Sequence, residues 1–351
     1  MTAAVSARDR RHMLALTAGM WDALRGERVF LTGGTGFVGT WLVEAFVAAN
    51  AAYGLDARLV MLSRDPARFA ARAPHLANDP AVRLLAGDVR DFPFPSGPCA
   101  FVVHAATDRD DDPAREPIRW LDHETAATRR VLELASAAAA RRVLFVSSGA
   151  VYGVQPADMA RVPETHAGAP DATDPRAVIG NGKRLCEFLC ACYAQAHGFD
   201  AVTARLFAFV GPHLPLDGPF AIGSFLADVL AHRAIRIGGD GTAVRSYLYA
   251  ADLAVWLWTM LLRGAPGRAY NVGSDQAVSI RELGEVVAAT LAPGTPIEIA
   301  RRAMPGQAGA RYVPSVDRAA SELGLRVAIP LPDALRRTYE FYRNPVAANG
   351  A

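Results

Sequence analysis

The sequence predicts an α/β fold in which a doubly wound parallel sheet carries a smaller α/β lobe. Short apolar runs alternate with helical segments from residue 28 to residue 206, and this alternation is typical of a parallel sheet with helices on both faces. The first apolar run ends in a glycine-rich turn, and the alternation loosens after residue 211, where prolines and glycines become frequent. The chain of 351 residues exceeds what one core usually holds, so two lobes are expected.

Each apolar run is short and bounded by turn residues, as the buried strands of a parallel sheet are. The segments between these runs are longer and have helical periodicity. Strands are predicted at 28–32, 58–62, 82–85, 100–103, 143–146 and 202–206, helices at 39–49, 120–138 and 183–197, and a strand that returns to the sheet at 269–272.

The composition argues against several classes of protein. The formal net charge is only +2 and no basic block occurs, so neither nucleic acid nor an anionic membrane is an expected partner. The longest apolar stretch, 253–262, is shorter than the about 20 residues that a membrane-spanning helix needs. No signal peptide is recognisable at the N-terminus.

The cysteines are Cys99, Cys186, Cys190 and Cys192. Three of them lie in one predicted helix, and a zinc site would need more ligands at compact spacing. Buried thiols are therefore favoured over a metal site. Reduced cysteines without an export signal indicate the cytoplasm.

The segment 32–39, TGGTGFVG, follows the first predicted strand and opens a helix. Its glycines permit a tight turn, a close approach of the backbone to a pyrophosphate, and close packing of the helix on the strand. The helix N-terminus offers free N–H groups to the phosphates. This context favours a dinucleotide site over an ordinary tight turn. The predicted contacts are Gly33, Thr35, Gly36, Phe37, Val38 and Gly39.

The Gly-x-x-Gly-x-x-Gly spacing resembles that of the short-chain dehydrogenase/reductase superfamily, which has a Rossmann-type fold. Asp88 and Val89 follow the third strand, where that superfamily places its adenine-contacting aspartate; a turn-forming aspartate is the alternative. Ala105, next to His104, lies in what resembles the superfamily's cofactor loop. The resemblance implies that these residues contact a nicotinamide dinucleotide.

The second strand ends in Ser63 and Arg64 rather than in an acidic residue. A carboxylate there would bind the ribose 2′-hydroxyl of NAD, whereas an arginine can pair with the 2′-phosphate of NADP. NADP is therefore favoured over NAD. The alternative is that Arg64 stacks on the adenine or caps the strand.

The segment 145–153, FVSSGAVYG, resembles the active-site strand of the extended members of the superfamily, which are NAD(P)-dependent epimerases, dehydratases and ketoreductases of nucleotide sugars. Ser148 aligns with their catalytic Ser or Thr, and Tyr152 with a structural tyrosine. The 4,6-dehydratases carry an acidic pair directly after that Ser or Thr. Gly149 and Ala150 stand there instead, which disfavours 4,6-dehydration because elimination of water needs a general acid and a base.

Lys183 aligns with the lysine of the family's Tyr-x-x-x-Lys motif, but Ile179 replaces the tyrosine. In the family that tyrosine exchanges a proton with the sugar hydroxyl. Isoleucine cannot transfer a proton, the pKa of Ser148 is too high for it to act unaided, and no other tyrosine lies near position 179 in the sequence. Lys183 can still hold the nicotinamide ribose or donate a proton itself. Glu124, in place of the family's usual Asn, is a second departure.

Several other groups are candidates for a replacement proton donor, but a structural or solvated role is favoured for each. These groups are His104, His166 and the aspartates at 108 and 110–112.

Two arginines in the second lobe resemble the family's diphosphate ligands. Arg245 closes the segment 239–245, GDGTAVR, and Arg311 opens the segment 311–317, RYVPSVD. Two guanidinium groups converging on a diphosphate form strong bidentate bonds. Each arginine alone is more often a surface residue.

The resemblance divides the chain into three parts. Residues 1–23 are an N-terminal lead-in, either flexible or a short helix. Residues 24–211, with a return strand near 245–275, form the dinucleotide-binding domain. Residues 212–244 and 276–345 form the substrate-binding lobe.

The resemblance implies an NAD(P)-dependent epimerase or 4-ketoreductase that acts on a nucleotide-activated sugar by hydride transfer, with Ser148 and Lys183 as catalytic residues and an atypical proton donor. It also implies a homodimer formed through the helices at 120–138 and 183–197. Two alternatives stay open. One is a sensor that binds cofactor and nucleotide without turnover, and the other is unconventional chemistry on a related substrate.

Overall fold

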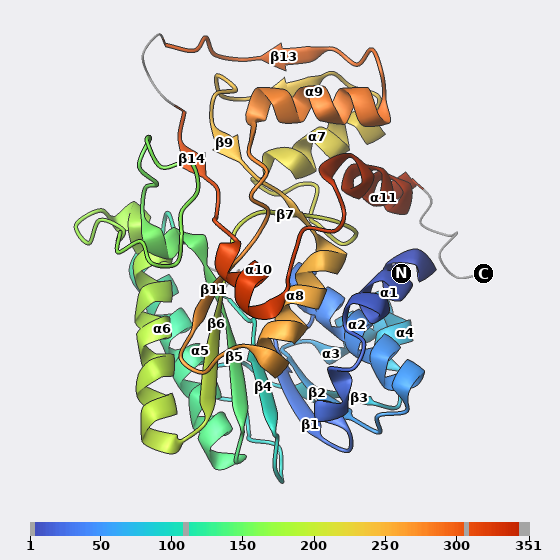
Figure 1. Ribbon diagram of the computed structural model, residues 1–351, viewed down its shortest axis with the longest axis vertical. Helices are drawn as coiled ribbons and strands as arrows, with labels where there is room; N and C mark the ends of the chain where they lie inside the picture. Colours follow the sequence, from blue (N-terminus) through green and yellow to red (C-terminus); the bar gives the residue numbers. More distant parts are fainter. Residues whose placement is uncertain (1–3, 108–111, 305–308, 344–351) are drawn as a thin grey trace.

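The central element of the protein is a seven-stranded parallel sheet with the strand order β11-β6-β5-β4-β1-β2-β3. The computed structural model describes residues 4–107, 112–304 and 309–343. The order reverses direction beside β1, so the sheet is doubly wound, as predicted (Figure 1). Its strands are β1 (Arg28–Thr32), β2 (Arg58–Ser63), β3 (Val82–Ala86), β4 (Phe101–His104), β5 (Arg142–Ser148), β6 (Asp200–Leu206) and β11 (Ala269–Val272).

Helices cover both faces of this sheet, because alternate residues of each strand point to opposite faces. Val29 and Leu31 of β1 belong to a core formed with α2 and α8, whereas Phe30 belongs to a second core formed with α5 and α6. The covering helices are α1 (Ala7–Leu16), α2 (Phe37–Tyr53), α3 (Pro66–Arg72), α4 (Pro74–Ala77), α5 (Pro117–Ala137), α6 (Val178–His197) and α8 (Ala250–Arg263).

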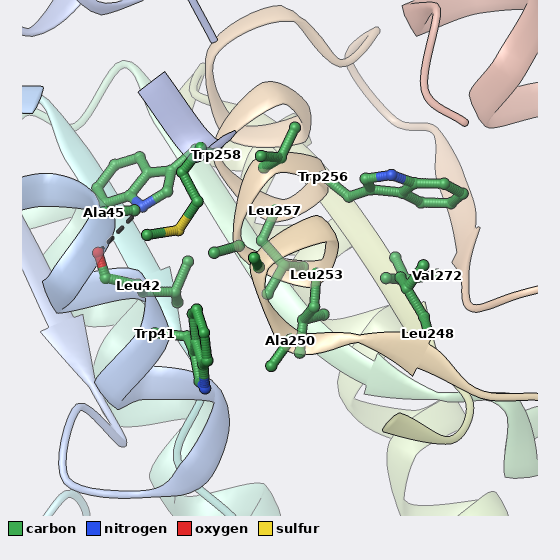
Figure 2. Packing of buried hydrophobic residues seen from close by; sticks show 14 of the residues in the cluster. Trp41, Leu42, Ala45, Leu248, Ala250, Leu253, Trp256, Leu257, Trp258 and Val272 are labelled. Atoms are coloured by element: carbon green, nitrogen blue, oxygen red, sulfur yellow. Dashed lines mark hydrogen bonds between the residues drawn. The ribbon is translucent and has the colours of Figure 1, made fainter. Parts of the chain in front are cut away.

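Tryptophans fill the contact between α2 and α8 (Figure 2). The Trp258 indole is 2% exposed, and its Nε1 donates to the carbonyl oxygen of Leu42 at 3.1 Å. Trp41 Nε1 donates to the Pro212 carbonyl oxygen at 2.9 Å. The indole N–H groups of Trp41 and Trp258 therefore both have a partner, as burial of this group requires.

The N-terminal segment is part of this core. In the described part of the predicted lead-in, residues 4–23, the structure has a helix: α1 packs on α2 and α8, and a 3₁₀ turn, η1 (Trp21–Leu24), follows it. Asp9 of α1 is buried and accepts a hydrogen bond from Arg337 at 2.7 Å and one from the Tyr249 hydroxyl at 3.0 Å. The segment is thereby tied to both lobes.

The second lobe lies over the carboxyl ends of the central strands (Figure 1). Its helices are α7 (Ala221–Leu230), α9 (Ile280–Leu291), α10 (Asp317–Leu323) and α11 (Leu331–Arg343). Its short strands pair as β8 (Ile235–Ile237) with β13 (Ile297–Ile299), β7 (Phe209–Val210) with β10 (Leu248–Tyr249), and β9 (Val244–Arg245) with β12 (Val278–Ser279) and β14 (Arg311–Tyr312). Two further turns, η2 (Gly149–Tyr152) and η3 (Pro175–Ala177), connect the sheet to α6. Among the described residues, no helix is long and apolar enough to cross a bilayer.

Candidate active site

The glycine turn connects β1 to α2 and is shaped by close backbone contacts. Gly33 has a φ of +73°, and a Cβ added to it would lie 2.5 Å from the Ala105 carbonyl carbon. A Cβ on Gly39 would lie 2.5 Å from Gly34 Cα. Neither position can carry a side chain without moving the backbone. The turn therefore packs against Ala105 at the end of the adjacent strand, and the contact of Ala105 with a cofactor stays a prediction.

Gly36 is less crowded than Gly33 and Gly39. It is the N-cap of α2, no side chain caps the helix, and an added Cβ would come no closer than 3.4 Å to any atom. The N–H groups at the start of a helix lack intrahelical partners and attract anions. The turn thus fits a pyrophosphate, the group that a dinucleotide would place there.

A cleft of about 420 Å³ opens beside this turn. Arg72 of α3 closes one side, and its Nη2 donates to the Thr35 carbonyl oxygen. His213, Leu214 and Tyr342 line the other side. Sequence reasoning missed Arg72 and His213, because neither residue belongs to a motif and both come from segments distant in the chain.

The adenine side of the predicted site lies at the ends of β2 and β3. Asp88 accepts hydrogen bonds from Arg90 Nε at 2.7 Å, Arg90 Nη2 at 2.9 Å and the Arg90 backbone N–H at 3.0 Å. The hydrogen bond from the Arg90 side chain, together with the charge of the nearby Arg64, holds the pKa of Asp88 below its usual value. Ser63 is buried and Arg64 is exposed. Asp88 therefore forms a turn, and its contact with adenine stays a prediction, as do those of Ser63, Arg64 and Val89.

Lys183 is buried in α6 and forms an ion pair with Glu124 of α5. Its Nζ donates to Glu124 Oε1 at 2.5 Å and to the Val146 carbonyl oxygen at 3.3 Å, while Thr107 Oγ1 donates to Glu124 Oε2 at 2.9 Å. Lys183 is only 6% exposed, which excludes an ordinary surface lysine. The replacement of the family's Asn by Glu124 thus gives the lysine a carboxylate counter-charge.

Two opposing effects set the charge of Glu124. Burial raises its pKa, but the charge and hydrogen bond of Lys183 outweigh that effect, so the pKa lies below its usual value. His104 lies next to this pair and bridges Thr32 at 2.8 Å and Thr128 at 3.1 Å. Burial, reinforced by the charge of Lys183, lowers the pKa of His104 to about 4. The imidazole is therefore neutral near pH 7 and holds β1 to α5, which is the structural role predicted for it.

Ser148 ends β5, and its Oγ accepts a hydrogen bond from the Ala150 N–H at 3.1 Å. Ile179 lies one helical turn before Lys183 and is 38% exposed. Residues four apart share one face of a helix, so Ile179 presents an apolar side chain where the family has its phenol. The site around Ser148 therefore lacks a proton donor at that position.

Tyr312 of β14 supplies a phenol from the other lobe. Its hydroxyl lies 3.5 Å from Ser148 Oγ and donates to the Leu206 carbonyl oxygen at 3.2 Å. Its ring packs on Phe207 with a centroid distance of 4.6 Å. Sequence reasoning missed this residue because 164 positions separate it from Ser148, and no local pattern indicates the contact.

The two predicted diphosphate ligands lie on neighbouring strands. In the parallel pairing of β9 and β14, Arg245 lies beside Tyr312 and Arg311 beside Val244. Because successive side chains alternate between faces, the two guanidinium groups leave the strand pair on opposite faces. Arg311 Nη1 lies 3.5 Å from the Ala160 carbonyl oxygen. The structure thus does not bring the two groups together, and their contacts with a diphosphate stay predictions.

The other candidate proton donors are placed as follows. His166 is partly buried, and its ring centroid lies 6.3 Å from that of Tyr152. Asp112 accepts a turn hydrogen bond from the Ala114 N–H at 2.9 Å, and the aspartates at 108, 110 and 111 lie outside the described residues. Tyr152 donates to Asn271 Oδ1 at 2.8 Å and accepts from Arg205 at 2.9 Å, as a structural residue does.

Known proteins with similar sequences act on nucleotide sugars. A UDP-glucuronic acid decarboxylase 1 from Arabidopsis thaliana is 26% identical over 332 residues, which cover 91% of this chain and 70% of that protein. The UDP-glucuronic acid decarboxylase 1 of Xenopus tropicalis is 24% identical over 325 residues, covering 90% of this chain and 72% of that protein.

Solved structures share the fold. The UDP-glucose 4-epimerase of Thermotoga maritima, solved with UDP-glucose, matches with a TM-score of 0.74 at 19% identity and covers 90% of this chain and 99% of its own. A dTDP-glucose 4,6-dehydratase from Streptomyces venezuelae, solved with NAD, matches with a TM-score of 0.74 at 24% identity, covering 90% and 97%. The model of the NAD-dependent epimerase/dehydratase family matches residues 29–273. With that match covering more than half of its length, the chain belongs to this family, a branch of the extended short-chain dehydrogenase/reductases.

Proposed function

We propose that the protein is an NAD(P)-dependent epimerase or 4-ketoreductase, which moves a hydride at a ring carbon of a nucleotide-activated sugar and uses a proton donor other than a tyrosine at position 179. One observation carries this proposal: the glycine turn, Ser148 and Lys183 all lie at the same edge of the sheet. The turn follows β1, Ser148 ends β5, and Lys183 contacts Val146 of β5. Ligands of open α/β sheets bind at this edge. The names of the relatives, which refer to UDP-sugars, support the substrate class.

The residues present suit separate parts of this reaction. When bound, the dinucleotide supplies a nicotinamide ring that accepts and returns a hydride. The open N-terminus of α2 binds the pyrophosphate. Two of the three hydrogens on Lys183 Nζ are held by Glu124 and Val146, and the third serves a ribose hydroxyl. Ser148 orients the sugar oxygen, and Arg245 is the arginine proposed to pair with the diphosphate of the nucleotide.

The proposal is tested by titrating the purified protein with NAD(H) and NADP(H), and by following reduced nicotinamide absorbance with UDP- and dTDP-linked hexoses, their 4-keto derivatives and UDP-glucuronic acid. We expect dinucleotide binding and turnover of at least one of these sugars. Binding of the dinucleotide with no turnover of any of them would contradict an enzyme and favour the sensor, for which the isoleucine at position 179 is the specific observation.

Arg64 is the residue on which a preference for NADP depends. Replacing Arg64 by Ala is expected to weaken NADP binding by about 10- to 100-fold, because a charge-assisted bond to a phosphate contributes about 1.5–3 kcal/mol. NAD binding should change little, since NAD has no 2′-phosphate. Fluorescence titration of the reduced cofactors measures both dissociation constants.

Arg68 offers a matched control, because it is an exposed arginine on the adjacent helix α3. Arg68→Ala removes the same charge and should leave the ratio of the two dissociation constants unchanged. Equal losses of NAD and NADP affinity in Arg64→Ala would remove the basis for the NADP preference.

A homodimer is proposed through α5 and α6, which pack side by side. Leu185 and Phe188 of α6 are 42% and 64% exposed, and Ile118 of α5 is 78% exposed. Large apolar side chains gathered on neighbouring helices are typical of an interface. Analytical ultracentrifugation measures the assembly, and a monomer at micromolar concentration would contradict this proposal.

A further inference from the structure

We propose that the Tyr312 hydroxyl, 3.5 Å from the Ser148 hydroxyl, exchanges the proton with the sugar oxygen in place of the tyrosine that position 179 lacks. This inference rests on the proposed function, since it names the acid/base group of that reaction. A general acid or base must lie within hydrogen-bond reach of the reacting oxygen, with geometry considered before pKa. The substitute comes from the second lobe and not from the helix that carries Lys183.

The position of the phenol is set from three sides. Parallel pairing of β14 with β9 fixes its backbone. The Phe207 ring supports one side of the Tyr312 ring, and the Leu206 carbonyl oxygen accepts from its hydroxyl at 3.2 Å. Leu206 pairs with Ser148 in the register of β5 and β6. The phenol oxygen therefore lies at the carboxyl edge of the sheet, between the ends of two adjacent strands.

Gly149 is the residue that leaves room for this phenol. A Cβ at position 149 would lie 2.7 Å from the Tyr312 hydroxyl oxygen and 2.7 Å from Phe207 Cζ. This is one of the two positions at which the dehydratases that the sequence resembles carry their acidic pair. The phenol thus occupies space into which an acidic side chain at position 149 would extend. The glycine at position 149, in place of an acidic residue, therefore makes room for the Tyr312 phenol from the second lobe.

The pKa of Tyr312 lies above its usual value because burial is the largest effect on it, but several neighbouring groups oppose that rise. Burial raises the pKa of Tyr312, while the Ser148 hydroxyl, the charge of Arg245 and the N–H groups of Gly149 and Ala150 act in the opposite direction. Arg245 is the charged group that acts on it and is its neighbour in the strand pairing. These groups would stabilise a phenolate at the moment when it has to accept a proton.

Tyr152, in the turn η2 that follows Ser148, differs from Tyr312 in the partners of its hydroxyl. Burial raises its pKa to about 12. Its hydroxyl donates to Asn271 and accepts from Arg205, so its hydrogen-bonding capacity is used within the protein. The Tyr312 hydroxyl faces a serine that is itself expected to hold the substrate.

The proton and electron balance of the step is as follows. As a sugar hydroxyl is oxidised, its carbon passes a hydride, two electrons and one proton, to the oxidised nicotinamide dinucleotide. The O–H bond breaks and that proton goes to the oxygen of the Tyr312 phenolate, which becomes a neutral phenol and leaves a carbonyl on the sugar. In the reverse direction the carbonyl carbon accepts the hydride, and the Tyr312 O–H bond breaks to protonate the oxygen. Ser148 donates a hydrogen bond to that oxygen in both directions.

The first test compares Tyr312→Phe with Tyr270→Phe. Tyr270 is a matched control, because its buried hydroxyl also bonds within the protein, to Glu322 at 2.8 Å and to the Ala265 N–H at 3.1 Å, away from Ser148. Tyr312→Phe is expected to lower kcat by about 10²- to 10⁴-fold, the usual contribution of a general acid or base. The dinucleotide dissociation constant should stay within about twofold, and the rise of kcat/KM with pH in the oxidation direction should disappear. Tyr270→Phe should keep both. A Tyr312→Phe enzyme that retains kcat and this pH profile overturns the inference.

The second test needs no turnover and so separates this inference from the proposed function. Fluorotyrosine is placed at position 312 of the full-length protein, and its ¹⁹F resonance is titrated with pH. We expect the apparent pKa to fall when oxidised dinucleotide binds, because the nicotinamide ring is positively charged, and to rise in the Ser148→Ala background. If neither dinucleotide binding nor Ser148→Ala changes the apparent pKa, the assignment of Tyr312 is overturned, even if the enzyme turns over a sugar. A protein that shows both responses but turns over none of the sugars contradicts the proposed function, whereas the coupling of the Tyr312 phenol to Ser148 and to the dinucleotide stands.

Discussion

Replacing Glu124 by Gln is expected to lower the free energy of unfolding by about 3–5 kcal/mol, the cost of breaking a buried ion pair by removing one partner. Glu124 and Lys183 are 1% and 6% exposed, and their charged atoms lie 2.5 Å apart. Glutamine keeps the shape of the side chain and leaves the ammonium group without a counter-charge. Urea unfolding at pH 7, followed by circular dichroism, measures the difference.

A surface pair on the same helix serves as the control. Glu133 of α5 lies 3.6 Å from Arg130 with its side chain 42% exposed, and an exposed pair contributes about 0–1 kcal/mol. Glu133→Gln should therefore have little effect. The double variant Glu124→Leu with Lys183→Met should recover much of the lost stability, because apolar residues of similar volume can replace a buried pair. A Glu124→Gln protein as stable as the wild type would show that the lysine finds another partner.

The same pair predicts how stability depends on pH. The pKa of Glu124 is lower in the folded protein than its usual value of 4.5. A group with a depressed folded pKa contributes stability above its unfolded pKa, and this contribution is lost as the pH falls through the folded pKa. The gap in stability between wild type and Glu124→Gln should therefore be largest above about pH 5 and shrink on acidification.

The sheet could be predicted from the sequence because its strands are buried on both faces. Such strands are continuous apolar runs bounded by glycines and polar residues, and the predicted 28–32 and 58–62 lie within one residue of β1 and β2. Helix starts were less accurate. The predicted helices at 120 and 183 begin at Pro117 and Val178. Proline is well suited to the first helical position, and Pro117 occupies that position in α5.

Glycines explain why the predicted helix start at residue 183 differs from the observed start of α6 at Val178. Gly180 and Gly182 disfavour a helix by propensity, but tertiary contacts require them there. A Cβ at 180 would meet the Ala150 carbonyl carbon at 3.1 Å, and one at 182 would meet the Trp120 ring at 2.8 Å. The start of α6 is thus packed against η2 and α5, which a local pattern cannot indicate.

The same distinction between local patterns and long-range contacts applies to the candidate site. The glycine turn, Ser148 and Lys183 are each recognisable from neighbours in the sequence. The partners that determine their chemistry are not, since Glu124 is 59 residues from Lys183 and Tyr312 is 164 residues from Ser148. Tyr312 lies on a two-residue strand whose place depends on the docking of the second lobe. The absence of a phenol at position 179 was visible in the sequence, and the presence of one beside Ser148 was not.

Replacing Gly39 by Ala is expected to weaken dinucleotide binding by at least about 100-fold, which corresponds to about 2.7 kcal/mol. Gly39 lies in the first turn of α2. An added Cβ would overlap the Gly33 carbonyl oxygen and would lie 2.5 Å from Gly34 Cα. These atoms belong to the backbone of the loop, so no side chain can move to relieve the overlap. The helix has to shift away from the loop, and the N–H groups that meet the pyrophosphate shift with it.

A helical glycine elsewhere in the chain separates this effect from an ordinary change in helix propensity. Gly284 lies within α9, and a Cβ there would have its nearest neighbour at 3.6 Å, an ordinary contact. Gly284→Ala should leave dinucleotide affinity unchanged and stabilise the protein by about 0.4–1 kcal/mol, because alanine loses less backbone entropy on folding. Fluorescence titration of the reduced dinucleotide and thermal unfolding measure the two quantities. If Gly39→Ala binds the dinucleotide as tightly as Gly284→Ala does, the cofactor does not lie at the N-terminus of α2, and the roles proposed for Ser148 and Lys183 lose their support.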